Sequence, residues 1–188
     1  MEEEQEPPSP TALTVSALVF YVVMAVIGAG VIAAQELDWV VVVFGDGANL
    51  LRDGVAGVIA GLSVVGLTHL SLRIEAVRTL NNELKSMLGT PGSGAITVLA
   101  VSSAVGEELL FRGALQPMLG LLVTSVIFAA LHGGLNPTFR LWAVFALGAG
   151  LLLGGLTLWT DNLLAAILCH LTVNYFNLHT VIHGEERA

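Results

Sequence analysis

Three charged side chains lie in a stretch that is otherwise apolar or small, from Val105 to Leu115. They are Glu107, Glu108 and Arg112. At the centre of a membrane helix each charge costs roughly 2.5–3.5 kcal/mol on insertion scales, so three cost on the order of 8–10 kcal/mol. Such a cost must be offset, either by a partner or by a function that needs the charges.

Helical geometry supplies part of that offset. Glu108 and Arg112 are four residues apart, so on a helix they share a face and can pair. Glu107 lies about 100° around the helix from Glu108, so it can point elsewhere, toward a polar cavity. One glutamate can therefore hold the arginine while the other stays free for proton chemistry. The alternative is a buried ion cluster that only fixes helix packing, which small residues achieve at lower cost.

Further polar groups lie in two later apolar segments. His132 directly follows the apolar segment that ends Phe128-Ala129-Ala130-Leu131. His170 and Asn174 are four residues apart, so they share one face of a helix. A glutamate beside a histidine can hold a water molecule and remove its proton, and a histidine–asparagine pair can donate hydrogen bonds to the oxyanion that forms when water attacks a carbonyl. With Glu107, the set meets the needs of amide hydrolysis without a serine or cysteine nucleophile.

Each histidine alone also fits a structural role, as a hydrogen-bond partner between helices. The occurrence of a glutamate, two histidines and an asparagine on three separate apolar segments favours a site. The other histidines keep a structural or interfacial interpretation: His69, His179 and His183.

The segments that carry these residues belong to a membrane protein. The chain is 55% hydrophobic and only 12% charged, about half the charged fraction of a soluble domain. The runs Thr11–Ala34 and Leu141–Thr160 contain no charged residue, and both reach the roughly 20 residues that a transmembrane helix needs. The first run follows an acidic start where a secretory signal is basic, so residues 1–10 are expected to be a disordered acidic tail before a retained helix.

We expect an all-α, polytopic membrane bundle of about six transmembrane helices. The expected spans are Thr11–Ala34, Gly54–Leu72, Ala95 to about Gln116 before Pro117, Met118–Leu131, Arg140–Thr160 and Asn162 to about His183. Two pairs of glycines, Gly57 with Gly61 and Gly150 with Gly154, have the spacing of close helix contacts.

Two connections are less regular. Residues 35–53 contain the β-branched run Trp39–Phe44, which fits either a re-entrant or interfacial piece or a long loop. Residues 73–94 are expected to form a polar loop, and three of the seven basic residues lie there. The positive-inside rule places that loop in the cytoplasm, and counting spans places both termini there as well.

Composition excludes other classes. The net charge of −8 leaves no basic patch for nucleic acid, and the single Cys169, expected to be a buried apolar filler, excludes an intrachain disulfide. The Gly-x-Ser-x-Gly and Gly-x-Gly-Asp motifs of other intramembrane proteases are absent. A proton relay in a proton-coupled transporter stays open as an alternative, although no internal repeat is evident. A non-catalytic membrane scaffold or immunity protein is the other alternative.

The polar residues resemble a known set of motifs. In order, these are Glu107-Glu108-x-x-x-Arg112, Phe128-x-x-x-His132 and His170-x-x-x-Asn174. They are similar to the three signatures of the CAAX protease and bacteriocin-processing family, also called the CPBP or Abi family. The resemblance covers about residues 95–176, with all three motifs in order.

The resemblance implies an intramembrane endopeptidase core at residues 95–183, after N-terminal transmembrane helices and a polar loop at 11–94 and before a tail at 184–188. It implies that Glu107 activates water with His132, and that His170 and Asn174 form the oxyanion site. Supporting residues would be Glu108, Arg112 and Phe128.

The resemblance also bears on cofactor and substrate. Glu107, His132 and His170 would make a His₂Glu set if zinc were used, but no His-Glu-x-x-His pair is present and no cofactor is favoured. The expected partners are the lipid bilayer and a membrane-associated peptide or protein substrate. Eukaryotic relatives cleave prenylated CAAX proteins, whereas bacterial relatives have mostly unknown substrates, some linked to bacteriocins. The small size argues against a prenylated substrate. The expected location is a bacterial or archaeal cell membrane, with the chain as a multi-pass protein.

Overall fold

The computed structural model describes residues 9–134 and 137–183. All regular elements in this part of the chain are helices, without a β-strand, so the all-α prediction is confirmed. The helices are α1 (Pro10–Ala34), α2 (Trp39–Phe44), α3 (Leu50–Ser71), α4 (Glu75–Leu88), α5 (Ser93–Glu108), the π-helix η1 (Leu109–Leu115), α6 (Gln116–Ala129), the π-helix η2 (Ala130–Gly134), the 3₁₀-helix η3 (Pro137–Phe139), α7 (Arg140–Thr160) and α8 (Leu164–His183). The expected tails, apart from residues 9 and 10, lie outside the described residues.

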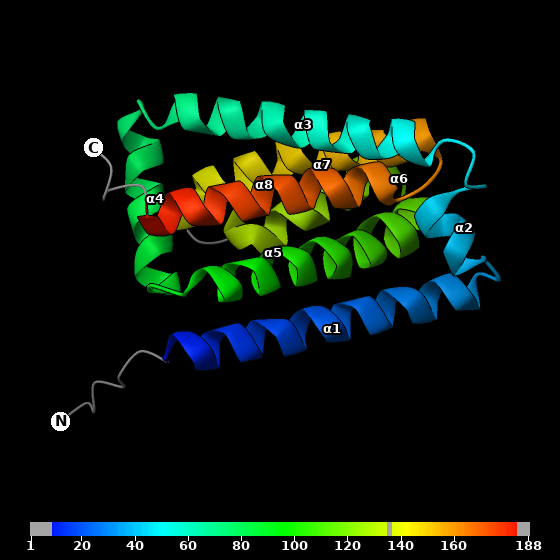
Figure 1. Cartoon of the computed structure of the whole chain (residues 1–188), viewed down its shortest axis with the longest axis horizontal. Coiled ribbons are helices and arrows are strands. Elements are labelled where there is room, and N and C mark those ends of the chain that lie inside the picture. Colours follow the sequence, from blue (N-terminus) through cyan, green and yellow to red (C-terminus); the bar gives the residue numbers. More distant parts are fainter. Residues whose placement is uncertain (1–8, 135–136, 184–188) are drawn as a thin grey trace.

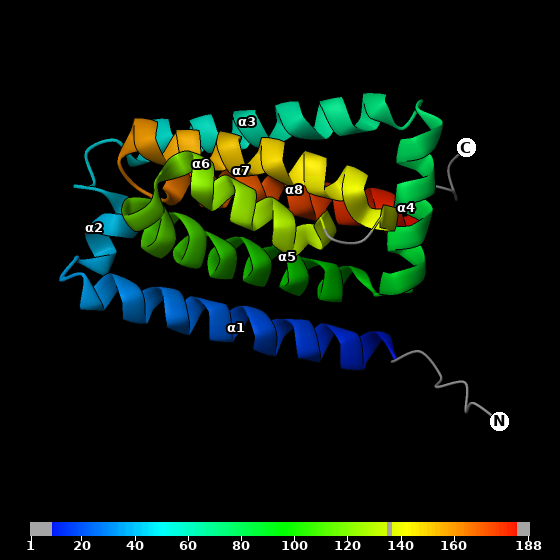
Figure 2. The same ribbon diagram turned by 180° about the vertical axis from the view of Figure 1, so that it is seen from behind.

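The long helices lie side by side along one axis, with α4 across one end and α2 at the other (Figures 1 and 2). Helix α1 packs on α5 at one edge, and α3 packs on α8 at the opposite edge. Helices α5 and α8 contact each other in the middle of the bundle, while α6 and α7 pair behind them in the view of Figure 1. The two helices at the centre, α5 and α8, therefore have protein on several sides.

Five stretches are long and apolar enough to cross a membrane, which makes this an integral membrane protein. They are Pro10–Ala34, Leu50–Ser71, Ser93–Gly133, Pro137–Thr160 and Leu164–His183. The third of them is 41 residues long, about twice the length that a bilayer requires. The expected number of about six crossings depends on how this stretch is folded.

The long stretch reverses direction at Gly120. Its backbone angles there are φ 79° and ψ 166°, a conformation that is open to glycine and closed to other residues. The sequence predicted a break before Pro117, and that position is wrong. Pro117 instead lies inside the helical run that continues from η1 into α6, ahead of the kink at Gly120.

Contacts with α7 establish the reversal. Arg112 donates to the carbonyl oxygen of Gly150 at 3.4 Å, and Gln116 donates to that of Gly154 at 3.1 Å. Both partners advance by four residues, so η1 runs parallel to α7. Further along α6, however, Ser125 packs against Gly150, so the rest of α6 runs antiparallel to α7. Six helical segments therefore run along the long axis, and the fourth of them is short.

Residues 35–53, between the first two spans, include a short helix. Asp38 begins α2 by accepting a hydrogen bond from the backbone N–H of Val40 at 2.8 Å. Helix α2 lies at the end of the bundle (Figure 1), where its Val42 carbonyl accepts the backbone N–H of Leu163 at 3.0 Å. Helix α3 then begins at Leu50, four residues earlier than expected.

The segment expected to be a polar loop is an amphipathic helix, α4. Its apolar residues recur at helical spacing, and Leu84 and Leu88 pack against Ile96, Val181 and Ile182 of the two central helices. Helix α4 crosses the bundle at the end where α1 begins and α8 finishes (Figure 1). That arrangement agrees with the expected common side for this segment and both termini. The cytoplasmic assignment of that side stays a prediction.

Glycines of α3 allow it to approach α8 closely. A Cβ atom at Gly57 would overlap the backbone of Ala165, and one at Gly61 would lie 2.7 Å from Cβ of Thr172. The small-residue contact predicted for this helix is therefore confirmed. Gly150 and Gly154 similarly admit α6 to the surface of α7.

We expect Gly57→Ala to lower the free energy of unfolding by about 1–3 kcal/mol, because the added Cβ forces α3 away from α8. Gly66→Ala is the matched control on the same helix, since nothing lies within 4 Å of a Cβ atom there. The control is expected to gain up to about 1 kcal/mol from helix propensity. Thermal unfolding in detergent measures both variants, and equal melting temperatures would contradict the close contact.

Candidate active site

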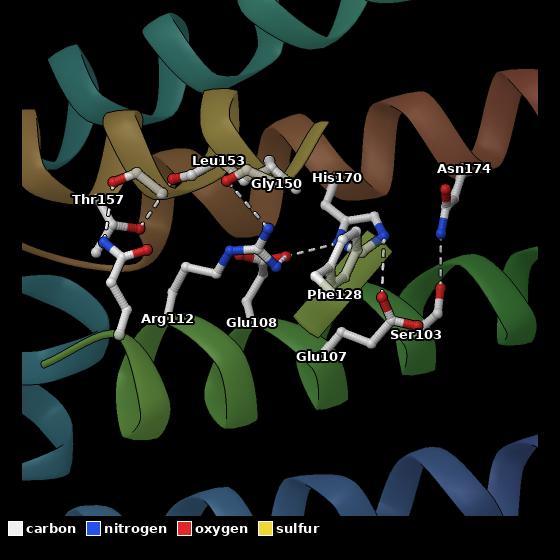
Figure 3. Close-up of polar contacts among 12 residues, drawn as sticks. Ser103, Glu107, Glu108, Arg112, Phe128, Gly150, Leu153, Thr157, His170 and Asn174 are labelled. Carbon is white, nitrogen blue, oxygen red and sulfur yellow. Dashed lines mark hydrogen bonds and ion pairs between the residues drawn. The ribbon is translucent and has the colours of Figure 1, made fainter. Parts of the chain in front are cut away.

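A buried ion pair forms where α5 continues into the π-helix η1. Arg112 Nη1 donates to Glu108 Oε1 at 2.9 Å, and both side chains are almost fully inaccessible. The guanidinium also donates to the carbonyl oxygen of Gly150 and lies 4.4 Å from the ring centre of Phe128. The pairing expected from the four-residue spacing is present, and contacts with α6 and α7 hold the arginine in place (Figure 3).

Glu107 points away from this pair, toward two histidines. Its Oε2 atom lies 3.8 Å from Nε2 of His132 and 3.8 Å from Nε2 of His170. The side chains of Glu107 and His170 are 8% and 7% exposed, whereas that of His132 is 20% exposed. Within the described part of the chain, Oε2 has no hydrogen-bond partner. Three polar atoms from α5, η2 and α8 thus converge on one point, which is most accessible on the His132 side.

Hydrogen bonds orient both histidine rings. Nδ1 of His132 lies 2.7 Å from the carbonyl oxygen of Phe128, which can only accept, so Nδ1 carries the hydrogen. Nδ1 of His170 lies 2.7 Å from Glu108 Oε1, the oxygen that also accepts from Arg112. A carboxylate also accepts, so the same assignment holds for His170. Both Nε2 atoms are therefore the ones that face Glu107, and a neutral ring presents a lone pair there.

Aromatic contacts hold His132 further. Its ring centre lies 4.2 Å from that of Phe128 and 5.4 Å from that of Trp142, which meets it edge-on. Phe128 thus contacts both His132 and Arg112, which agrees with its expected supporting position.

Asn174 lies one turn beyond His170 on α8, and its side chain faces α5. Its Nδ2 donates to Oγ of Ser103 at 2.9 Å (Figure 3). Ser103 in turn lies one turn before Glu107 on α5. The structure therefore brings Glu107, His132 and His170 together, and it places Asn174 beside them with a serine as its partner.

Three contacts of the site were not anticipated from the sequence. Ser103 carries a usable signal, because it is four residues before Glu107 and so shares its helix face. Trp142 and the carbonyl of Gly150 carry none, since only the packing of α7 brings them to the site.

Two further histidines of α8 make ring contacts of their own. The rings of Tyr175 and His179 are 4.8 Å apart, and those of His179 and His183 are 5.7 Å apart. Such stacking along α8 is consistent with the structural role expected of these histidines. Cys169 is a free, buried thiol, as expected.

Glu107, His132 and His170 are of the residue types that bind catalytic zinc. Ligand atoms of a tetrahedral zinc ion lie about 2.0–2.2 Å from the metal, which places them about 3.4 Å from one another. The 3.8 Å distances from Glu107 to the two histidines are wider than that, and no group of three or more such ligands in the described ranges has metal-site geometry. Glu107 therefore lies farther from each histidine than two ligands of one zinc ion lie from each other.

The part of the chain that carries this site is similar to known proteins. Residues 89–176 match the family model described as "Type II CAAX prenyl endopeptidase Rce1-like". "Uncharacterized protein YpbD" of Bacillus subtilis (strain 168) is 38% identical over 84 residues, which cover 42% of this chain and 41% of that protein. The chain thus matches about two fifths of that relative's length. No solved structure matches. Residues 89–176, which supply the buried polar cluster, are thus similar to the Rce1-like CAAX protease family.

Proposed function

We propose that this protein is an intramembrane endopeptidase that hydrolyses a peptide bond of a membrane-associated protein or peptide. The observation that carries the proposal is the convergence of Glu107 with His132 and His170 at 3.8 Å in a largely buried site. One water molecule at about 2.8 Å from each atom can bridge groups at that separation. The site therefore has room for a water molecule between a base and a second acceptor.

The reaction needs no covalent intermediate. Glu107 removes a proton from the water while the oxygen attacks the carbonyl carbon of the substrate, and His132 orients the water through its Nε2 lone pair. The carbonyl oxygen becomes an oxyanion. Glu107 then passes the proton to the leaving nitrogen as the C–N bond breaks, which releases an amine and a carboxylic acid and restores the glutamate.

In this proposal His170 and Asn174 stabilise the oxyanion. His170 can donate from Nε2 only when its ring carries both protons, because Nδ1–H is already bound to Glu108 at 2.7 Å. The Glu108 carboxylate stabilises that imidazolium, and Arg112 holds the carboxylate in position at 2.9 Å. Hydrogen bonds of this kind to a developing negative charge supply much of the rate enhancement in acyl transfer.

The depth of the site supports a substrate within the membrane. Glu107 lies fourteen residues after Ser93, the first residue of α5, which corresponds to about 21 Å along an α-helix. The hydrocarbon core of a bilayer is about 30 Å thick, so the base lies well inside it. A cleavable segment must therefore enter the bilayer region. The relative in Bacillus subtilis supports a bacterial or archaeal cell membrane as the location.

The transporter alternative finds less support in the geometry. The contacts from Glu107 through His170 and Glu108 end at Arg112, and a guanidinium stays protonated in proteins. A proton relay along this line would stop there. The other alternative is a non-catalytic scaffold or immunity protein of the same fold. A cleavage assay distinguishes it from the proposed protease, because such a protein would cleave no peptide.

The test is cleavage by the purified protein in liposomes. A labelled library should contain prenylated and unprenylated peptides with and without an apolar anchor, and products are identified by mass spectrometry. The expected result is cleavage of anchored peptides by the wild type and none by Glu107→Ala. Equal cleavage by both proteins, or none by the wild type, contradicts the proposal.

In the same assay, exhaustive chelation is expected to leave the cleavage rate unchanged, because the proposed steps use only side chains and water. A zinc protease assayed in the same buffer is the control and must lose its activity. Loss of cleavage that zinc restores would instead assign Glu107, His132 and His170 as metal ligands.

A further inference from the structure

We propose that Ser103, which lies outside the three motifs, is a positioning residue that fixes the amide of Asn174 for the reaction. The inference rests on the proposed function, because it concerns the oxyanion site of that reaction. It adds a hydroxyl group on α5 to a pair of donors on α8.

The hydrogen bonds around Ser103 define which way the Asn174 amide faces. The Ser103 hydroxyl donates to the carbonyl oxygen of Ala100 at 3.2 Å, so Oγ meets Asn174 with its lone pairs. Asn174 must then present its NH₂ group rather than its oxygen, and it does so at 2.9 Å. Ser103 is only 4% exposed, so water competes little for this contact. One amide hydrogen is bound, and the second stays free to donate.

The packing of α5 against α8 places the Asn174 side chain one helical turn from the base. The two helices are antiparallel, so Ser103 lies opposite Asn174 one helical turn from where Glu107 lies opposite His170 (Figure 3). Residues four apart lie on one face of a helix. Glu107 and the two oxyanion donors therefore lie along the same interface between α5 and α8. Ser103 lies at one end of this row of residues.

The neighbouring serine shows what a purely local hydroxyl does. Ser102 donates to the carbonyl oxygens of Val98 and Leu99, at 2.7 and 3.3 Å, within its own helix. Ser103 makes the same kind of bond to Ala100 and also accepts from another helix. Without that acceptor, the Asn174 amide can rotate about its terminal side-chain bond, a broad torsion. The fraction of molecules with a donor correctly placed then falls.

The first experiment compares Ser103→Ala with the matched control Ser102→Ala. For a peptide that the wild type cleaves, Ser103→Ala is expected to lower kcat about tenfold with KM unchanged, less than the loss of a whole oxyanion donor. Ser102→Ala is expected to match the wild type. On an Asn174→Ala background, Ser103→Ala should cause no further loss, because the serine acts through the asparagine.

The second measurement does not depend on activity. In protein labelled with ¹⁵N at asparagine, the side-chain amide signal of Asn174, identified by its loss in Asn174→Ala, should shift in Ser103→Ala and not in Ser102→Ala. An unchanged signal overturns the inference, even in a protein that cleaves nothing. Full kcat in Ser103→Ala beside a reduced kcat in Asn174→Ala also overturns it while the proposed function stands. Absence of cleavage by the wild type removes the proposed function, and the catalytic role of Ser103 with it.

Discussion

Glu107→Gln is expected to lower the cleavage rate by roughly 10²–10⁴-fold, the contribution of a positioned general base. Glutamine has nearly the same shape as glutamate, but its amide cannot take a proton from water. Oε2 of Glu107 has no hydrogen-bond partner in the described residues, so the substitution breaks no bond of the fold. A buried carboxylate itself destabilises the folded protein, and the substitution removes that charge.

The loss of activity should therefore occur without loss of stability. Glu75→Gln, at an exposed position of α4, is the matched control and is expected to keep full activity. Initial rates and melting temperatures in detergent measure the two effects separately. Retention of more than about a tenth of the wild-type rate in Glu107→Gln would rule out its role as the base.

The largest loss of stability is expected from Arg112→Met, about 3–5 kcal/mol in the free energy of unfolding. Methionine fills a similar volume, but Glu108 then keeps a buried charge without its partner at 2.9 Å. His170 also loses a well-held acceptor, because its Nδ1 hydrogen binds the same carboxylate oxygen. Urea unfolding in mixed micelles measures the change, and cleavage should fall with it.

A second substitution should recover part of this loss. Glu108→Gln combined with Arg112→Met removes both charges, so the double variant is expected to be more stable than Arg112→Met alone. Arg78→Met on the exposed side of α4 is the control, with an expected change within about 0.5 kcal/mol. Equal stability of the single and double variants would show that the charge of Glu108 is not what destabilises the protein.

Local spacing was sufficient to predict part of this structure. Long apolar runs indicated the helices, and Arg140–Thr160 is α7 as expected. The four-residue interval predicted the pairing of Glu108 with Arg112, because both residues lie on one helix. The convergence of Glu107 with residues of two other helices follows from helix packing, which no interval along the chain encodes. The motif resemblance, rather than spacing, joined those residues in advance.

The remaining errors also have physical causes. Helix α4 replaces the predicted polar loop because Val77, Leu80 and Leu84 recur at helical spacing, which gives the helix one apolar side that packs on the bundle. The sequence predicts the break at Pro117 because proline usually stops a helix in its interior, whereas here helical residues continue past it to the kink at Gly120. The partner of Asn174 required the relative register of α5 and α8, which only tertiary contacts determine.

The π-helix at Leu109–Leu115 restricts how the length of this protein can vary among its relatives. A π-helix incorporates extra residues in a helix whose two ends stay in place. Deleting one residue there would leave an ordinary α-helix between the same two ends, and the side chains inside Leu109–Leu115 would then point in other directions. Insertions and deletions should therefore accumulate in the turns around α2 and α4. The interval from Glu107 to Arg112 should keep a constant length in every homologue that retains the activity.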